Sequence, residues 1–443
     1  MATKSDLIEA QNFSRRRLLT AFVSGAPGGK EMEPTAPLRA VIAAVALTLG
    51  VVLVGVFYGL IKPGLPSGWD NGKLILVSDT GARFVTIEGE LHPVINTASA
   101  RLLLPASGFE VITTDQQNLS GVSVGDTLGI VGAPDELPPA DNLLATGWSA
   151  CVADDAGVAV RIGSGAPAVT EGAVVVDVDG ERFVVDGERS FAVDAASGDA
   201  VLRAAGITAV NPVEVSAAWL NLFIAGTPLE PLVVEGAGER LSGTDLAVGD
   251  VVHIRGQADD ERLLVQSDGT LAQLTPLAWQ LYQLGSGADL DGVTEVSSAA
   301  VADIPSAPIG AGGADWPETG FTAIPTDQRP CALLDGDGAA GSRTVLAAQD
   351  ADVTVSAGVR IAAGHGALVY AGGRGEQKTG ILTLIDATGT AYPLPGATEE
   401  TVNRLGYDLD DIGSAAQGWI ALFETGPALT EEAAGTSPAV DEE

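Results

Sequence analysis

The chain has 443 residues and a formal net charge of −35, because 58 Asp and Glu side chains stand against only 23 Lys and Arg. Nucleic acids and anionic lipid surfaces would repel so acidic a chain, which argues against both as its partners. Glycine is abundant (56 residues) and aromatic residues make up only 5%, a composition that favours short strands joined by tight turns over a helical bundle.

The first 39 residues form a basic leading segment, with six Lys and Arg against four Asp and Glu. A capping pattern at Asp6 and Glu9 predicts a helix that stops before Gly25 and Pro27. We interpret residues 1–39 as a cytoplasmic arm. It is either solvated beside the membrane or a docking helix for a cytoplasmic partner.

Residues 40–61 are 22 consecutive uncharged, mostly apolar residues. As a helix this run is about 33 Å long, enough to cross the hydrocarbon core of a bilayer. We therefore predict a single-pass membrane protein with a body, residues 62–429, on one side of the membrane. Because Lys and Arg near a span tend to stay cytoplasmic, the N-terminus is expected inside the cell and the body outside.

Two kinds of cleaved targeting signal compete with a retained anchor. The apolar run is longer than the core of a secretory signal peptide, and no small-residue cleavage site follows it. Residues 14–19 (Ser-Arg-Arg-Arg-Leu-Leu) look like a twin-arginine export signal, but residues 25–33 separate them from the apolar run. A retained membrane anchor is the preferred interpretation.

Within the body, four segments share one plan: an apolar strand, a Gly-containing turn, a second strand and a stretch with helical spacing. Asp-Gly and Thr-Gly turns are typical of hairpins because Gly adopts the positive φ that such turns need. A ββα unit is too small to bury its own core, so about four such repeats should pack against neighbours or a shared sheet. The four hairpins begin at Leu74, Val174, Leu263 and Ile381, and the clearest helical stretches are residues 98–104, 195–202 and 399–405.

Three further segments are expected as strands of a central barrel or sheet: residues 122–133, 251–255 and 353–361. Residues 285–320 have the composition of a loop. The acidic tail, residues 430–443, is expected to be disordered.

The chain has two cysteines, Cys151 and Cys331. Outside the cell such a pair predicts a disulfide, which would close a loop of about 180 residues and restrict the unfolded chain by about 5 kcal/mol in the entropy model. It would clamp two halves of the body together. A metal or catalytic pair is the alternative, but no His lies near either Cys and no C-x-x-C occurs.

Three glycine-rich matches to catalytic motifs stand in the wrong context. Residues 336–341 match G-x-G-x-x-G and residues 121–125 match G-x-S-x-G, but a strand-like segment follows each where the motif requires a helix. Residues 372–379 nearly match a phosphate-binding loop, with Gln377 in place of the second glycine and Lys378 and Thr379 as candidate nucleotide contacts. The three histidines form no metal-ligand spacing, so no catalytic residue, metal or cofactor is predicted.

Residues 91–102 (Leu-His-Pro-Val-Ile-Asn-Thr-Ala-Ser-Ala-Arg-Leu) resemble a hallmark stretch of the EccB family, a membrane component of actinobacterial type VII secretion. Further similar segments follow in the family's order, at residues 129–134, 392–394, 405–407 and 426–429, and Cys331 falls where a partner for Cys151 is expected. The departures are a shortened, less basic arm and an unusually acidic body. The family-motif residues are His92, Pro93, Asn96, Ser99, Arg101, Gly132, Pro134 and Trp148.

The resemblance implies a single-pass subunit of the secretion membrane complex, supporting export of WXG-type proteins. Its N-terminal transmembrane helix would be followed by an elongated, β-rich (α+β) extracytoplasmic domain with a central β core, repeats and one disulfide. The implied partners are an EccC-type ATPase, EccD, EccE, the mycosin protease and further copies of the chain.

Two other functions remain open. Members of the family have been described as ATPases, which would make ATP a ligand, and Lys378 and Thr379 are the candidate contacts for it. An extracytoplasmic receptor unrelated to secretion is the third hypothesis.

Overall fold

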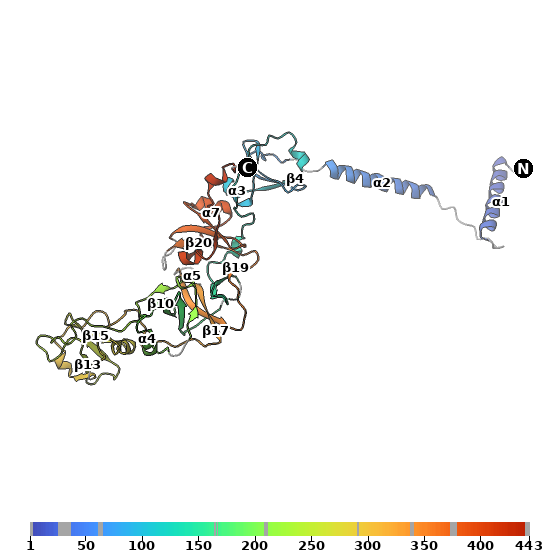
Figure 1. Ribbon diagram of the computed structural model, residues 1–443. Coiled ribbons are helices and arrows are strands. Elements are labelled where there is room, and N and C mark those ends of the chain that lie inside the picture. Colours follow the sequence, from blue (N-terminus) through green and yellow to red (C-terminus); the bar gives the residue numbers. More distant parts are fainter. Residues whose placement is uncertain are drawn as a thin grey trace. The chain divides into compact units, whose positions relative to one another are not determined.

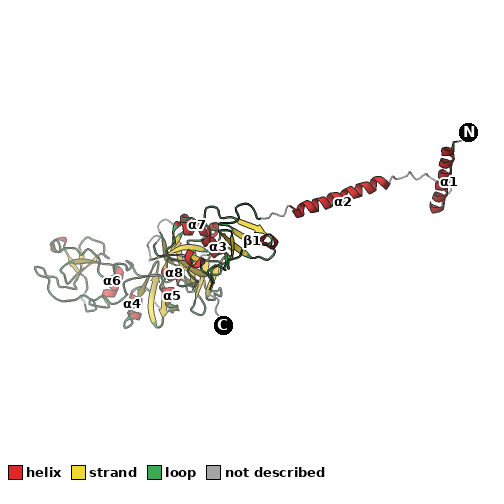
Figure 2. Cartoon of the chain, turned by 90° about the horizontal axis from the view of Figure 1, so that it is seen from above, coloured by secondary structure: helices red, strands yellow, loops and turns green. Residues whose placement is uncertain are grey.

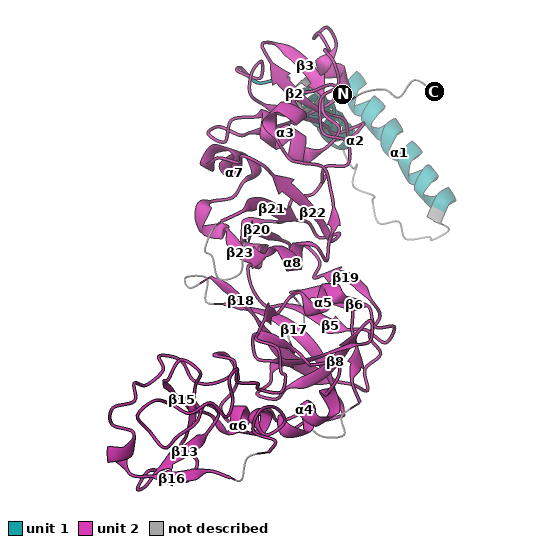
Figure 3. Ribbon diagram, turned by 60° about the vertical axis from the view of Figure 1, so that its left-hand side comes forward, with its two compact units in different colours: residues 1–66 teal, residues 67–443 magenta. Residues whose placement is uncertain are grey.

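The computed structural model describes residues 3–24, 37–60, 65–163, 165, 167–207, 211–289, 292–336, 341–372 and 379–438. The chain divides into two compact units, Met1–Pro66 and Ser67–Glu443 (Figure 3). The first unit holds the two longest helices, whereas the second, called the body below, consists of strands and short helices (Figure 2).

The first unit contains helices α1 (Lys4–Ser24) and α2 (Pro37–Leu60). Helix α1 ends directly before Gly25, as Gly25 and Pro27 predict. It begins at Lys4, however, so the predicted cap at Asp6 is wrong: Asp6 lies in the first turn, where its carboxylate accepts from the Thr3 N–H over 2.9 Å. Residues 38–57 of α2 have a mean hydropathy of 2.8, and none of this stretch is buried. By length and composition α2 is thus able to cross a membrane, and it covers most of the predicted span, residues 40–61.

Four of the five sheets described in the body share one connectivity, and we call them modules 1 to 4 (Figure 1). In each module two hairpins join three antiparallel strands, and a seven-residue helix then leads to a fourth strand that pairs parallel with the first. The helix is needed because two parallel neighbours cannot be joined by a tight turn.

Modules 1 and 3 have four named strands each. Module 1 contains β1 (Leu74–Val77), β2 (Arg83–Ile87), β3 (Glu90–Pro93), α3 (Thr97–Leu103), β4 (Val111–Thr114) and the 3₁₀ helix η1 (Gln116–Leu119). Module 3 contains β13 (Val251–Ile254), β14 (Arg262–Val265), β15 (Leu271–Leu274), α6 (Pro276–Tyr282), β16 (Thr294–Val296) and η3 (Ser298–Ala300).

Modules 2 and 4 add a fifth strand, parallel to the third. Module 2 contains β8 (Val174–Val178), β9 (Glu181–Asp186), β10 (Arg189–Ala192), α4 (Gly198–Ala204), β11 (Val213–Glu214), α5 (Ala217–Leu220) and β12 (Ile224–Ala225). Module 4 contains β20 (Ala367–Gly372), β21 (Ile381–Ile385), β22 (Thr390–Leu394), α7 (Glu399–Leu405), η4 (Leu409–Asp411), β23 (Gly413–Ala416), α8 (Gln417–Ile420) and β24 (Glu424–Thr425).

In modules 1 and 3 an isolated parallel bridge to the third strand stands where modules 2 and 4 have their fifth strand. Leu91 of β3 bridges to Val124, and Leu271 of β15 bridges to Ser306. All four modules therefore return the chain along the outer side of their third strand.

The fifth sheet is central and six-stranded, in the order β19-β6-β5-β17-β18-β7. Its strands come from two distant parts of the chain, because modules 2 and 3 lie between them in sequence. They are β5 (Trp148–Val152), β6 (Val158–Ile162), β7 (Ala168–Val169), β17 (Gln328–Gly336), β18 (Ser342–Asp350) and β19 (Gly358–Ile361); η2 (Ala140–Asn142) precedes them and α9 (Glu431–Ala434) follows module 4.

Three large apolar clusters connect the sheets. The first joins the central sheet to modules 2 and 4 around three fully buried tryptophans, Trp148, Trp219 and Trp419. The second joins modules 2 and 3, and the third joins modules 1 and 4. Modules 2 and 4 thus contact the central sheet directly, and each shares a second core with one further module.

The predicted hairpins and helices are present, with one shift in alignment. The hairpins at Leu74 and Val174 are the first and second strands of their modules, but those at Leu263 and Ile381 are the second and third. Each module contains two hairpins, and either of them matches the predicted strand–turn–strand pattern. The predicted ββα unit therefore lacks one antiparallel strand and the parallel fourth strand.

The predicted central strands are mostly wrong. Residues 122–133 form turns with isolated bridges, since Gly121, Gly129 and Gly132 all adopt positive φ. Strand β13 belongs to module 3, and only β19 of the expected segment 353–361 joins the central sheet. Residues 285–320 are mainly irregular among those described, as predicted.

The predicted disordered tail also differs in its described part. Residues 431–434 form α9, and Ala434 is fully buried in the core shared by modules 1 and 4. Composition alone favoured disorder because five of the last thirteen residues are Glu or Asp. Two of these acids, however, lie in the first turn of α9, where negative charge stabilises a helix N-terminus. Residues 439–443 lie outside the described residues.

Candidate functional site: the joint between modules 1 and 4

Asn96 is the N-cap of helix α3, and its buried side chain forms hydrogen bonds in two directions. Its Oδ1 accepts from the Ser99 N–H over 2.9 Å and caps the helix. Its Nδ2 donates to the Ile130 carbonyl over 2.7 Å. One amide thus starts the helix and holds the loop formed by residues 127–135, which we call the motif loop.

Ser99 completes this attachment from the first turn of α3. Its Oγ accepts from the Ile130 N–H over 2.9 Å, so both backbone groups of Ile130 are bonded to α3 side chains. Gly129 precedes Ile130 at φ +135°, and a Cβ there would lie 2.6 Å from Cγ1 of Ile95. Only glycine allows so close an approach of the motif loop to α3.

The other motif residues around β3 also form intramolecular contacts. The Pro93 carbonyl accepts from the Leu128 N–H over 2.8 Å, and Nδ1 of His92 lies 3.0 Å from the Asp126 carbonyl oxygen. The Pro134 carbonyl accepts from the Ala98 N–H over 3.3 Å. Gly132 adopts φ +80° in the same loop. The two sequence motifs, residues 91–102 and 129–134, therefore bind each other.

Asp135 closes the motif loop. Its carboxylate forms an ion pair with Arg83 of β2 and accepts from the Thr97 N–H over 3.2 Å. The hydrogen bond from Arg83 lowers the pKa of Asp135 below its ordinary value. The loop is therefore tied to both the sheet and the helix of module 1.

Arg101 lies on the side of α3 that faces module 4. Its guanidinium stacks over the Phe109 ring, 4.0 Å from the centroid, and burial lowers its pKa. Among the described residues it has no carboxylate partner, and its Nε is buried without a hydrogen bond. Gly406 allows this approach, because a Cβ there would lie 3.0 Å from the Arg101 Nη1.

Two residues of module 4 fix the joint, and the motif analysis missed the first of them. Arg404 of α7 donates from Nη1 to the Leu102 carbonyl over 2.8 Å and forms ion pairs with Glu400 and with Glu431 of α9. The Tyr407 hydroxyl donates to the Pro138 carbonyl over 2.9 Å, and burial raises its pKa. Tyr407 lies in the family-like segment 405–407, but its partner could not be read from the sequence.

Trp148 and the two cysteines lie away from this joint, in the central sheet. Cys151 of β5 and Cys331 of β17 are directly opposite each other and form a disulfide, both fully buried. The predicted pairing is correct. The bond links neighbouring strands of one sheet, which come from chain segments on either side of modules 2 and 3. Trp148 stacks edge-to-face on Trp419, with ring centroids 6.2 Å apart.

The near-match to a phosphate-binding loop joins two antiparallel neighbours, β20 and β21. Lys378 lies outside the described residues, and Thr379 is followed by strand β21, whereas a phosphate-binding loop requires a helix at that point. Likewise, the described parts of residues 336–341 connect β17 to β18, and Ser123 lies in the turns beside β3. Across the described ranges, no group of three or more His, Cys, Asp or Glu is arranged to hold a metal.

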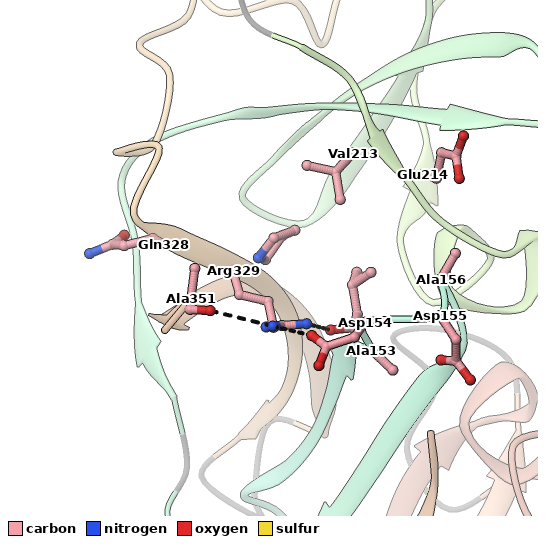
Figure 4. Close-up of a pocket in the computed structure, with 11 residues that line it drawn as sticks. Ala153, Asp154, Asp155, Ala156, Val213, Glu214, Gln328, Arg329 and Ala351 are labelled. Carbon is pink, nitrogen blue, oxygen red and sulfur yellow. Dashed lines mark hydrogen bonds and ion pairs between the residues drawn. The ribbon is translucent and has the colours of Figure 1, made fainter. Parts of the chain in front are cut away.

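A cavity of about 610 Å³ lies where the central sheet meets β11 (Figure 4). Figure 4 shows the guanidinium of Arg329 directed at Asp154. Arg329 also donates to the Val152 carbonyl over 2.8 Å, and its hydrogen bond to Asp154 lowers the pKa of that carboxyl. These two charged groups of the wall thus bind each other, while Asp155 and Glu214 are exposed to solvent.

The family model and the similar proteins of known name all belong to type VII secretion systems. The family described as "Type VII secretion system ESX-1, transport TM domain B" matches residues 1–439. The ESX-1 secretion system ATPase EccB1 of Mycobacterium tuberculosis is 25% identical over 427 residues, covering 89% of this chain and 85% of that protein.

Solved structures show the same fold. A chain of an intact ESX-5 inner membrane complex superposes with a TM-score of 0.65 at 20% identity, covering 100% of this chain and 97% of that one. A chain of the periplasmic assembly from the ESX-5 inner membrane complex gives 0.62 at 21% identity, over 86% and 99%. The EccB3 dimer from the ESX-3 core complex gives 0.65 at 22% identity, over 82% and 99%. With the family matched from residue 1 to residue 439, the chain belongs to the EccB family and is a component of the ESX type VII secretion membrane complex.

Proposed function

We propose that this chain is a structural and assembly subunit of the secretion complex, which supports export of WXG-type proteins by presenting a rigid body beside the membrane. One observation carries the proposal: Asn96, Ser99 and Pro134 of the family motifs use their polar groups to bind other parts of the same chain. A motif whose groups are bonded inside the fold serves architecture, whereas a catalytic motif would hold some of them open to a substrate.

The topology we propose is single-pass, with α2 in the membrane, residues 1–39 in the cytoplasm and residues 62–429, which hold the four modules and the central sheet, outside. The excess of basic residues before α2 supports this orientation. One of the similar chains belongs to a periplasmic assembly, which supports an extracytoplasmic body.

We also propose that modules 1 to 4 are repeats of one ancestral unit, each with three antiparallel strands, a helix and a parallel return. Their shared strand order supports this, as does the equivalent fifth position in all four. Buried Trp219 in α5 and Trp419 in α8 hold equivalent places in modules 2 and 4.

The proposed partners are the membrane subunits EccD and EccE, an EccC-type ATPase, the mycosin protease and further copies of this chain. The EccB3 dimer and the inner membrane complex named among the similar structures support self-association and membership of a larger assembly. Copurification in mild detergent, followed by mass spectrometry, would identify the partners.

Replacing residues 40–61 tests the scaffold role. Deletion should release the body from the membrane and abolish export, whereas an unrelated apolar 22-residue helix in their place should restore both. Protease added to intact spheroplasts should digest the body and spare residues 1–39. Export that persists without an anchor, or a body protected from external protease, would contradict the proposal.

ATP hydrolysis is the alternative function, because relatives such as EccB1 carry "ATPase" in their names. The purified full chain should then hydrolyse ATP, and Lys378→Ala should abolish the turnover while Lys73→Ala, a control in module 1, leaves it unchanged. Turnover equal in both variants would assign the hydrolysis to a contaminant or another site.

A further inference from the structure

The last described residues of the chain, Thr430–Pro438, lie across the joint between modules 1 and 4, and we call them the C-terminal strap. The strap begins with a cap, since the Thr430 Oγ1 accepts from the Ala433 N–H over 3.1 Å. It contains the four-residue helix α9 and continues as an irregular segment to Pro438.

The strap contacts module 4 through one acidic side chain. Glu431 forms an ion pair with Arg404 at 3.0 Å and accepts from the Thr401 Oγ1 over 3.3 Å. Both partners lie on α7, and Arg404 also bonds to the carbonyl of Leu102 at the end of α3. One guanidinium therefore touches module 1, module 4 and the strap.

The strap contacts module 1 through a backbone carbonyl and two small side chains. The Thr436 carbonyl accepts from the Gly129 N–H over 3.2 Å, and the Ser437 Oγ donates to the Thr127 carbonyl over 2.8 Å. Ala434 is fully buried in the core that contains Ala98 and Leu102 of α3. The space at residue 434 is therefore fitted to a small apolar group.

These contacts have the character of peptide recognition. The negative charge of Glu431 is recognised by Arg404, and the buried site of Ala434 accepts a small side chain. The backbone groups of Gly129 and Thr127 bind the strap by hydrogen bonds. Of the four helical residues of the strap, only Ala434 is buried. A helix of four residues is unstable on its own, so the strap should open well before the modules around it unfold.

We propose that α3, α7 and the motif loop form a docking surface for a short acidic peptide with a small residue three positions after its Glu, and that the C-terminal strap is its resident ligand. With the strap bound, modules 1 and 4 are held together at both α3 and the motif loop. With the strap released, both modules remain folded, but the joint opens.

Hydrogen exchange on the full chain in mild detergent tests this proposal. A chain ending at Leu429 should exchange about tenfold faster or more in α3 and the motif loop, with β5 and β17 unchanged. A chain ending at Pro438 is the matched control and should behave as the full chain. Unchanged exchange at the joint in the shorter chain would overturn the proposal. Loss of protection in β5 and β17 as well would also overturn it, because the strap would then be part of the core.

Return of the strap as a separate peptide tests recognition. A synthetic peptide of residues 430–438 added to the chain ending at Leu429 should slow exchange at the joint again, whereas the same peptide with Ala434→Glu should not. The substitution Arg404→Gln in the chain should weaken this rescue, while Arg203→Gln, on α4, should leave it intact. Equal protection by the two peptides would overturn the proposal, because the docking surface would then not distinguish a small residue at position 434 from Glu.

Discussion

Asn96 and Ile130 are joined by a hydrogen bond of 2.7 Å from the Asn96 side chain to the Ile130 carbonyl, which fixes the motif loop to the start of α3. Asn96→Ala should lower the free energy of unfolding by about 2–4 kcal/mol, since it removes a helix cap and leaves a buried carbonyl unbonded. Urea unfolding of the full chain in detergent, followed by tryptophan fluorescence, measures the change. Gln117→Ala, at an exposed position of η1, should change it by less than about 0.5 kcal/mol. Equal effects of the two substitutions would contradict the assigned role.

The disulfide gives a second prediction. Cys151→Ala with Cys331→Ala should cost about 3–5 kcal/mol, because the bond closes a loop with a sequence separation of 180 residues. In non-reducing electrophoresis the native chain should migrate faster than the reduced chain, and Cys151→Ser alone should migrate as reduced. Thiols that react fully with an alkylating reagent in freshly denatured cells would show that the bond does not form in vivo.

Trp219 tests how module 2 is held to the central sheet. Its indole N–H donates to the Ala150 carbonyl of β5 over 2.8 Å, and the ring is fully buried. Trp219→Phe should cost about 1–3 kcal/mol and Trp219→Ala about 3–5 kcal/mol. Val233→Ala, at a residue 70% exposed, is the matched control and should change the free energy of unfolding by less than about 0.5 kcal/mol. A free energy of unfolding that Trp219→Ala leaves unchanged would contradict the role of Trp219 in holding module 2 to the central sheet.

Asp135 gives a prediction about pH. Its pKa is lowered in the folded chain, so its contribution to stability is present above the ordinary Asp pKa and is lost as the pH falls through the folded-state pKa. Because the side chain is 58% exposed, Asp135→Asn should cost only about 0.5–1 kcal/mol at pH 7. The difference from the native chain should shrink below about pH 4. Asp126→Asn, on the exposed neighbouring turn, is the matched control and should change the free energy of unfolding at pH 7 by less than about 0.5 kcal/mol. A cost of Asp135→Asn that stays constant down to about pH 3 would exclude the ion pair as its source.

Local signals made much of the fold predictable. The turn at Asp179 and Gly180 has φ values of 54° and 89°, as an Asp-Gly hairpin requires. Helices α3 and α7 begin directly after Asn96 and Thr398, whose side chains cap them. In these places the short-range chemistry and the tertiary structure agree.

The parallel return strands of the modules could not be predicted. β11, β12 and β24 contain two residues each, too few for a periodic pattern. The central sheet pairs β5 with β17, and no local feature of residues 328–336 identifies that partner except Cys331. The joint depends on bonds such as Arg404 to Leu102, separated by 302 residues, and single-chain patterns carry no information at that distance.

The interruption of the central sheet by modules 2 and 3 has a consequence for synthesis. When β5 and β6 have been made, β17 is still some 180 residues away, so the growing chain exposes unpaired strand edges until the second half arrives. Modules 2 and 3, whose strands are close neighbours in sequence, are able to fold first and shorten that gap. Formation of the bond between Cys151 and Cys331 is then a late event, which takes place only after the two halves of the central sheet have met.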